Sequence, residues 1–456
     1  MKTLIAVNRF GLGARAGDAI SMAPRRWLLN QLERYEPRPS MWKSLPGSAE
    51  LAGELRAARL SMRDESDDTR KDARRKQRRD ARDTYRQAVD ARIHAAITTD
   101  TPFVERLVHF WSNHFAISVD KLVVAPLAGA FEFEAIRPHV LGRFEDMLLA
   151  VERHPAMQLY LDQVQSVGPN SPLARRRNDR NGERKAGLNE NLAREILELH
   201  TLGVRSGYSQ EDVTEFARAL TGWSFGGIGR RAEAEAAGQF MFRNALHEPG
   251  VRTIRGRRYA QEGEAQALAV LHDLAMAEAT ARHIATKLVR HFVADEPSPV
   301  LVNRLARVFD ETHGDLPSVY RALVDAPESA NPAARKFKTP WEWLISILRG
   351  IDVRDVGEMR SAAVLQQLGQ AVWQPGSPAG FDDVAASWAG PDALVRRVEV
   401  AQRIAERIGD RFDPRTLGEA LLHGGLGQST ARAIASAESR STGLALLLVA
   451  PEFLRR

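Results

Sequence analysis

Apolar residues recur at helical spacing along almost the whole chain, whereas few segments show the alternation that is typical of strands. Capping residues and Pro, Gly or Asp signals interrupt this pattern at intervals that suit helices of ordinary length. Helices with one apolar stripe bury it most simply against other helices. We therefore predict an all-α fold in which residues 1–456 form one large helical domain, as a single body or as two lobes.

The segment 49–97 is unusually rich in charge, with RKDARRKQRRDARDTYRQ at its centre. Acids and bases alternate at helical spacing and can pair one turn apart, which predicts a long, exposed helix. A polyanion-binding arm is the alternative interpretation. Tyr85 is the one aromatic residue at its centre, which is poor for stacking on single strands. Because the net charge is a modest +6, we do not expect a nucleic-acid partner.

Two segments lack helical periodicity. Residues 166–187 contain turn residues and many bases, which indicates a basic loop that could meet an anionic substrate. Residues 226–262 are irregular, with short extended pieces around 240–242 and 251–254. These pieces predict a small β-hairpin insertion near residues 240–256, with His247 exposed in its loop.

A proline- and glycine-rich interruption, PGSPAGFDDVAASWAGPDALVRR, breaks the helical pattern of the final third of the chain. Trp373, Phe381 and Trp388 lie in or beside it. They are expected either to line a groove or to pack beneath the loops.

The absence of cysteine excludes disulfides, thiolate metal ligands and a cysteine nucleophile. No uninterrupted apolar run approaches the roughly 18 residues that a membrane span needs. Asn8 and Arg9 interrupt the short apolar start before it reaches the length of a signal-peptide core. We expect a cytoplasmic protein without a membrane span, or a periplasmic or secreted one if a leader has been trimmed from the sequence.

The stretch 189–225 contains the most varied set of polar residues. It predicts two capped helices joined by a tight connection. On the first helix Asn191, Glu195 and Glu198 share the face opposite the apolar stripe. Two carboxylates one turn apart repel each other when both are charged, and one proton or one cation would relieve the repulsion. This pair therefore suits general acid–base chemistry or a divalent metal, unless it is simply a solvated face with Arg194 as counter-charge.

The second helix of this stretch contributes Arg218 on its polar face. A short connection predicts antiparallel neighbouring helices, so we expect Arg218 to approach Glu195 or Glu198. Trp223 follows a glycine at the helix end, where its ring could serve as a packing lid or as a platform for a sugar.

Further candidates come from two earlier helices. In TPFVERLVHFWSNHFAIS, His114 points into the apolar side with Asn113 beside it, which suits either a core histidine or a catalytic base. Glu134 and Arg137 lie three residues apart before Pro138. An intrahelical salt bridge is the simple explanation for that spacing, and Glu134 is also a candidate partner carboxylate.

Eight segments carry a family resemblance. They are NRFGLGAR, FWSNHFAIS, HPAMQLYLD, NENLAREILELHTLGV, YSQEDVTEFARALTGW, TARHIATKLVRHFVAD, KFKTPWEW and PEFLRR. Together they resemble the bacterial family known as domain of unknown function 1800 over nearly the whole chain, which argues against independent domains. The resemblance implies no particular activity. It does imply relatives that often carry export signals and are commonly encoded beside a secreted, sulfatase-like family.

These features support three functional hypotheses. The first is an enzyme, a hydrolase or lyase, that uses a carboxylate, histidine and arginine cluster for acid–base cleavage of a polar substrate or glycan, with a carbohydrate polymer as the substrate class. Its candidate catalytic residues are Glu195, Glu198, His114 and Glu134. Its candidate substrate-binding residues are Asn113, Arg137, Asn191, Arg194, Arg218, Trp223 and His247.

The second hypothesis is a divalent-metal-dependent enzyme with Glu195, Glu198 and a histidine as ligands, His114 first, then His109 or His247. No histidine pair has the H-E-x-x-H spacing of a zinc protease, so nothing in the local sequence supports that class of enzyme. A divalent metal is a possible cofactor, and its identity is left open. The third is a non-catalytic binding or assembly protein that works with a neighbour-encoded partner. In that case the polar cluster only locks helices together.

Overall fold

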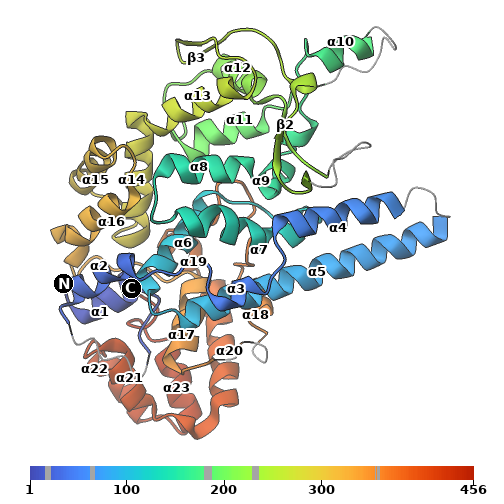
Figure 1. Ribbon diagram of the computed structural model, residues 1–456. Helices are drawn as coiled ribbons and strands as arrows, with labels where there is room; N and C mark the ends of the chain where they lie inside the picture. The colour runs from blue at the N-terminus through green and yellow to red at the C-terminus, as the bar shows by residue number, and fades with distance from the viewer. Residues whose placement is uncertain (16–21, 62–66, 179–186, 228–235, 355, 357–359) are drawn as a thin grey trace.

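The computed structural model describes residues 1–15, 22–61, 67–178, 187–227, 236–354, 356 and 360–456 (Figure 1). Helices make up 63% of the chain and strands 4%, which confirms the predicted all-α fold with a small β insertion. Among the described helices, none is both long enough and apolar enough to cross a membrane.

The first part of the chain is almost entirely helical. Its elements, in chain order, are α1 (Thr3–Ile5), η1 (Ala6–Phe10), α2 (Pro24–Asn30), η2 (Gln31–Glu33), α3 (Ser40–Lys43), α4 (Ser48–Ser61), α5 (Asp67–Thr98), α6 (Pro102–His114), η3 (Ala125–Leu127), α7 (Ala128–Phe131), η4 (Glu132–Ile136), η5 (Arg137–His139), α8 (Phe144–Arg153), α9 (Pro155–Tyr160) and η6 (Gln163–Gln165). Of these, η1 and η4 are turns of π-helix.

The second part holds the strands and the remaining helices. The helices are α10 (Pro172–Asn178), α11 (Asn191–Glu195), η7 (Ile196–His200), α12 (Gln210–Leu220), η9 (Asn244–Leu246), α13 (Glu264–Ala275), α14 (Glu278–Phe292), α15 (Pro299–Glu311), α16 (Leu316–Asp325), η10 (Pro327–Ala330), α17 (Pro340–Gly350), α18 (Ser361–Gln367), α19 (Ala385–Trp388), α20 (Pro391–Ile408), η11 (Gly409–Arg411), α21 (Pro414–Leu422), α22 (Gln428–Ala435) and α23 (Arg440–Leu448). The strands are β1 (Trp223–Phe225), β2 (Phe240–Phe242), β3 (Arg252–Ile254) and β4 (Arg257–Tyr259).

Two helices form the centre of the molecule. Every residue of α17 is buried, and so is every residue of α6 apart from Asn113. Helix α6 begins with Pro102, whose missing N–H would have had no partner inside the helix. Helix α17 begins with a capping box in which Thr339 and Glu342 exchange hydrogen bonds with each other's backbone. One continuous apolar core extends around both helices, from α1 to the segment that follows α23.

The other elements surround this centre in groups that are also close in sequence. Helices α14, α15 and α16 pack against one another on one side of the body (Figure 1). Helices α11, α12 and α13 lie with the strands at one end, and α20 to α23 form a bundle at the opposite end (Figure 1). Helices α4 and α5 project from the body together (Figure 1).

The charged segment 49–97 forms α4 and most of α5, and residues 62–66 lie outside the described residues. In its exposed outer turns, Lys71 pairs with Asp68 at 3.2 Å and Arg86 pairs with Asp83 at 3.3 Å, each one turn apart. Its last turns are apolar and join the core. The helix is therefore a solvated arm at one end and a core element at the other. The predicted basic loop 166–187 contains α10, and its residues 179–186 lie outside the described residues.

The β insertion consists of two antiparallel hairpins. The predicted extended pieces are present, but they do not pair with each other: β1 pairs with β2, and β3 pairs with β4. Arg255 and Gly256 connect β3 to β4 with φ angles of 52° and 75°. A two-residue turn with positive φ at both positions matches the twist of the strands on either side, so it closes a hairpin immediately. Of the predicted insertion, residues 228–235 lie outside the described part of the chain.

The π-helical turn η4 changes the ion pair that was expected between Glu134 and Arg137. In a π-helix, residues five apart come together, and Arg137 lies 3.5 Å from Glu132 instead. Arg137 also forms a two-pronged pair with Glu105 of α6, one bond of which is 3.0 Å long. Burial alone would raise the pKa of Glu105, but Arg137 and His109 hold it at about 2.

We predict that Arg137→Met destabilises the protein by about 3–5 kcal/mol, because it leaves two buried carboxylates without their shared cation. Chemical denaturation monitored by circular dichroism would measure this loss. Adding Glu105→Gln to the Arg137→Met variant should restore part of it.

The matched control is Arg25→Met. Arg25 pairs with Asp325 at 2.5 Å, but both side chains are exposed. An exposed pair contributes little to stability, because water and salt screen it, so Arg25→Met should cost far less than Arg137→Met. Equal losses in the two variants would contradict the role assigned to burial.

Candidate functional site

A cavity of about 340 Å³ opens between α5, α6, α14, α17 and the segment that contains Phe381. Its lining combines aromatic walls with a dense set of charges. The aromatic residues are Phe110, Trp341, Trp373 and Phe381. The cations are Arg92, Arg106, Lys287 and Arg290, and the acids are Asp295, Glu342, Asp382 and Asp383. His109 and His291 complete the polar lining.

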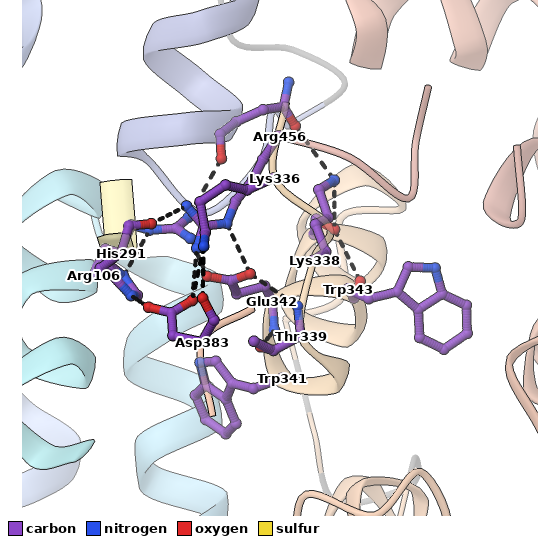
Figure 2. Close-up of polar contacts among 12 residues, drawn as sticks. Arg106, His291, Lys336, Lys338, Thr339, Trp341, Glu342, Trp343, Asp383 and Arg456 are labelled. Atoms are coloured by element: carbon purple, nitrogen blue, oxygen red, sulfur yellow. Dashed lines mark hydrogen bonds and ion pairs between the residues drawn. The ribbon is translucent and has the colours of Figure 1, made fainter. Parts of the chain in front are cut away.

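A buried ion network forms one side of this cavity (Figure 2). Glu342 forms an ion pair with Arg106 and accepts a hydrogen bond of 2.9 Å from Nε of Arg456 (Figure 2). Asp383 lies 3.4 Å from Arg456 and 3.6 Å from Lys336. Burial alone would raise the pKa of Glu342, but Arg106 and Arg456 hold it at about 2. The network therefore joins side chains from α6, α17, the segment before α19 and the end of the chain as fixed charges.

His291 is held in one tautomer by its two partners. Its Nδ1–H donates to a carboxylate oxygen of Asp383. Its Nε2 accepts from Nε–H of Arg106 at 3.3 Å, because a guanidinium can only donate. Burial lowers the pKa of His291 to about 4, although Asp383 opposes the shift. His291 is therefore neutral near pH 7, and neither of its ring nitrogens is available to a ligand.

Arg92 forms part of the opposite wall. Its guanidinium lies 4.4 Å from the ring centre of Trp341 and 5.2 Å from that of Trp373. Its Nε donates to Glu132 at 2.7 Å. Trp341 in turn donates its indole N–H to Nδ1 of His109 at 3.1 Å. Cation, rings and carboxylate therefore fix one another, and Arg92 has an ion-pair partner in Glu132.

Lys287 and Arg290 differ from the other cations of the cavity. They lie one turn apart on α14 and both line the cavity, but neither makes a side-chain hydrogen bond or ion pair with any described residue. Nε of Arg290 is buried without a partner. Burial lowers the pKa of Lys287 to about 8; Asp383 opposes the shift and Arg290 reinforces it. The cavity thus contains two cations that form no ion pair with the described part of the chain, although Asp383 is close enough to act on Lys287 electrostatically.

All of the site residues predicted from the sequence lie in the described ranges. His109, an alternative metal ligand in the second hypothesis, lines the cavity, and so does Asn113. Its amide donates to the carbonyl of Phe381 at 2.9 Å and accepts from the N–H of Phe381 at 2.7 Å. Gly380 has a φ of 83°, and a Cβ there would collide with the backbone of Asn113. Asn113 therefore positions the aromatic loop rather than facing a ligand alone. Trp373 and Phe381 line the cavity, as one of the two interpretations of that loop expected.

Glu195 and Glu198 lie on and beside η7, outside the cavity lining, and His114 reaches the same turn through His200. Burial raises the pKa of Glu195, and repulsion from Glu198 adds to that shift after the opposing effect of His200. Nε2 of His114 donates to the carbonyl of His200 at 3.2 Å, and Nδ1 of His200 lies 2.7 Å from Glu152.

The metal hypothesis gains no support from the region around η7. Among the described residues, no three His, Asp or Glu side chains converge in a way that could hold a metal ion. Glu198 lies 3.7 Å from Arg194, which also bonds to Glu190 and Gln210. Asn191 is exposed, and its backbone N–H is capped by Asn189 at 2.9 Å.

The remaining predicted residues make structural contacts elsewhere. Glu134 accepts from the backbone N–H of Ser48 at 2.9 Å and lies 3.1 Å from His154. Arg218 pairs with Glu215 on its own helix, so it does not cross to Glu195 or Glu198 as expected.

Trp223 and His247 are both buried near the hairpins. The ring of Trp223 packs 5.0 Å from that of Phe240. His247 was expected to be exposed, but its exposed fraction is 6%. Its ring lies against the end of α12, where Nδ1 donates to the carbonyl of Thr221 at 2.9 Å.

Sequence reasoning missed the charged residues that line the cavity. One signal was present in TARHIATKLVRHFVAD, where Lys287, Arg290 and His291 fall on one face of an amphipathic helix. Another was the pair of acids that follows Phe381 in the proline- and glycine-rich interruption. Neither signal indicates which distant segments will meet. The segments that meet at the cavity include five of the eight that carry the family resemblance: NRFGLGAR, FWSNHFAIS, TARHIATKLVRHFVAD, KFKTPWEW and PEFLRR.

Comparison with known proteins identifies one match. A family model described as protein of unknown function (DUF1800) matches residues 5–455. No curated protein and no solved structure matches the chain.

The buried histidines predict that stability falls as the pH is lowered. Burial lowers the pKa of His283 and of His291 to about 4 and lowers that of His114 well below its usual value. Between pH 6.5 and 4 the unfolded chain therefore binds protons at these residues and the folded chain does not. Each such histidine should cost about 1.4 kcal/mol of unfolding free energy per pH unit in that range. The buried carboxylates add a further loss only at lower pH.

Urea denaturation at a series of pH values between 7.5 and 4.5 would measure this dependence. His283→Gln should flatten it, because one proton-binding difference is removed. The exposed His272 provides the matched control as His272→Gln. An unfolding free energy that stays constant from pH 7 to 5 would contradict the assignment of neutral buried histidines.

Proposed function

Because the chain belongs to the DUF1800 family of proteins of unknown function, its activity has to be inferred from its own site, and we propose an enzyme that acts on a small anionic, polar substrate in the cavity. The observation behind this proposal is that Lys287 and Arg290 both line the cavity and form no ion pair with any described residue, and that Nε of Arg290 is buried without a hydrogen-bond partner. The proposal keeps the acid–base enzyme expected from the sequence. It assigns the proton transfer to α14 instead of to the carboxylates on and beside α11.

The contrast with the neighbouring cations supports an anionic ligand. Arg106 and Arg456 share Glu342, and Lys336 lies 2.5 Å from Asp295. A charge removed from water is costly unless an opposite charge compensates it. Lys287 and Arg290 form no ion pair within the described chain, and a bound carboxylate, sulfate or phosphate would give them a direct partner.

The aromatic walls favour a ring-shaped polar substrate. Trp341, Trp373 and Phe381 present apolar surface beside the charges, and the cavity volume is in the range of small-molecule sites. Such a combination suits a sugar ring that bears an acidic group, either free or at the end of a glycan. The sulfate or carboxylate would meet the cations while a face of the ring packs on an aromatic side chain.

Lys287 is the best-placed proton-transfer group. Glu342 and Asp383 already bind cations, and His291 has both ring nitrogens engaged. A pKa of about 8 lets the amine of Lys287 gain or lose a proton near neutral pH. Hydrolysis or eliminative cleavage of an acidic sugar would use this group as its acid or base. Acid–base roles for Glu195, Glu198, His114 and Glu134 stay predictions.

We predict that the protein binds acidic sugars and not their neutral counterparts. Isothermal titration calorimetry would compare glucuronate, galacturonate and glucose 6-sulfate with glucose and galactose. Lys287→Met and Arg290→Met should each weaken binding of the acids by about 10- to 100-fold, as expected for the loss of one charge-assisted hydrogen bond. Lys287→Met should also raise the melting temperature, because it removes an uncompensated charge.

Arg282→Met is the matched control on the same helix, since Arg282 is exposed and lies 3.6 Å from Glu278. It should leave binding unchanged. The proposal is overturned if no acidic sugar binds more tightly than its neutral counterpart, or if Lys287→Met lowers the melting temperature and leaves binding intact.

A further inference from the structure

We propose that Lys287 is a nucleophile that forms an imine with a carbonyl group of the substrate, while Arg290 binds the substrate's acidic group. This inference rests on the proposed function, because it requires an anion in the same cavity. It narrows the substrate to an anionic compound with an aldehyde or ketone, such as an open-chain or keto sugar acid.

The contacts of Lys287 set it apart from the other two lysines near the cavity. Lys336 forms an ion pair of 2.5 Å with Asp295 and donates to the carbonyl of Asp383 at 2.6 Å. Lys338 is buried, donates to Ser346 at 3.2 Å and lies 4.3 Å from the ring centre of Phe453. Lys287 has no such partner and lines the cavity. Its amine can therefore reach a ligand without breaking an existing bond.

The surroundings of Lys287 also favour the neutral amine, which is the nucleophilic form. Burial and the nearby guanidinium of Arg290 both disfavour the charged form, against the effect of Asp383. Arg290 itself keeps its charge, because a guanidinium does not lose its proton in proteins. The two residues thus suit different tasks: Arg290 binds an anion, and Lys287 reacts.

The proposed step is balanced without any further reagent. The nitrogen lone pair of Lys287 attacks the carbonyl carbon, and a proton passes from that nitrogen to the carbonyl oxygen, which gives a neutral carbinolamine. A proton from solvent then lets the hydroxyl leave as water, and a protonated imine remains. That cation can accept the electron pair of an adjacent bond when the bond breaks, and water later hydrolyses the imine and restores the amine. A lyase reaction on a sugar acid would follow this course.

Reductive trapping tests the proposal on the full chain. The protein would be incubated with pyruvate as a minimal anionic carbonyl compound and with sodium cyanoborohydride, and the modified peptides would be identified by mass spectrometry. We expect close to one adduct per chain, located at Lys287 and enriched about tenfold or more over an exposed lysine such as Lys71. Acetone, which has a carbonyl but no charge, should label Lys287 far less. Acidic sugars that bind should compete with the labelling.

Two variants separate the roles of the residues. Lys287→Arg keeps the cation, so it should still bind lactate but should give no adduct. Arg290→Met should reduce labelling by pyruvate without reducing labelling by acetone, and Arg290→Lys should restore part of it. A merely structural role for Arg290 would not produce that difference between the two probes.

The possible failures are distinguishable. Binding of lactate or acidic sugars without an adduct at Lys287 would overturn the imine and leave the proposed function in place. If none of these anions binds, the proposed function itself fails. Labelling of Lys287 no stronger than that of exposed lysines would also overturn the proposal.

Discussion

The carboxylate of Glu342 holds together the parts of the chain that form the cavity. It is buried at the start of α17 and pairs with Arg106 of α6 and with Arg456. Its other contact is the N–H of Thr339, which caps the helix on which Glu342 itself lies. A buried carboxylate between two buried guanidinium groups is stable only if all three are present. The position of α17 relative to α6, and with it the shape of the cavity, depends on this group.

The ion pairs of this network also show how the charges of Lys287 and Arg290 differ from those around them. The buried cations Arg106, Arg92 and Arg137 each have a carboxylate within 4 Å, on Glu342, Glu132 and Glu105 respectively. Lys287 and Arg290 project from α14 toward the same region and have none. An anionic ligand that bound here would lie beside both cations.

The helical architecture could be predicted because it depends on local signals. The capping box at Ser209 and the apolar stripe of α12 each depend on a few residues that are close in the sequence, and the structure contains both. The site could not be predicted in this way, because its parts come from residues as distant as Arg92, Lys287 and Asp383. The varied polar residues on and beside α11 instead led to the prediction that the site lies on that helix. The π-helical turn η4 was also beyond sequence reasoning, and it gave Arg137 different partners from those that α-helical spacing implied.

The buried position of Arg456 has a consequence for how the protein is made. The ribosome adds this residue after every other group of the ion network, and until then Arg106 alone, among the described residues, forms an ion pair with Glu342. Helices α6, α14 and α17 can form earlier during synthesis, since their signals are local. The cavity they enclose, however, reaches its final electrostatic balance only after residue 456 has been joined and its side chain has entered the core. A nascent chain would thus carry formed helices around an unfinished site.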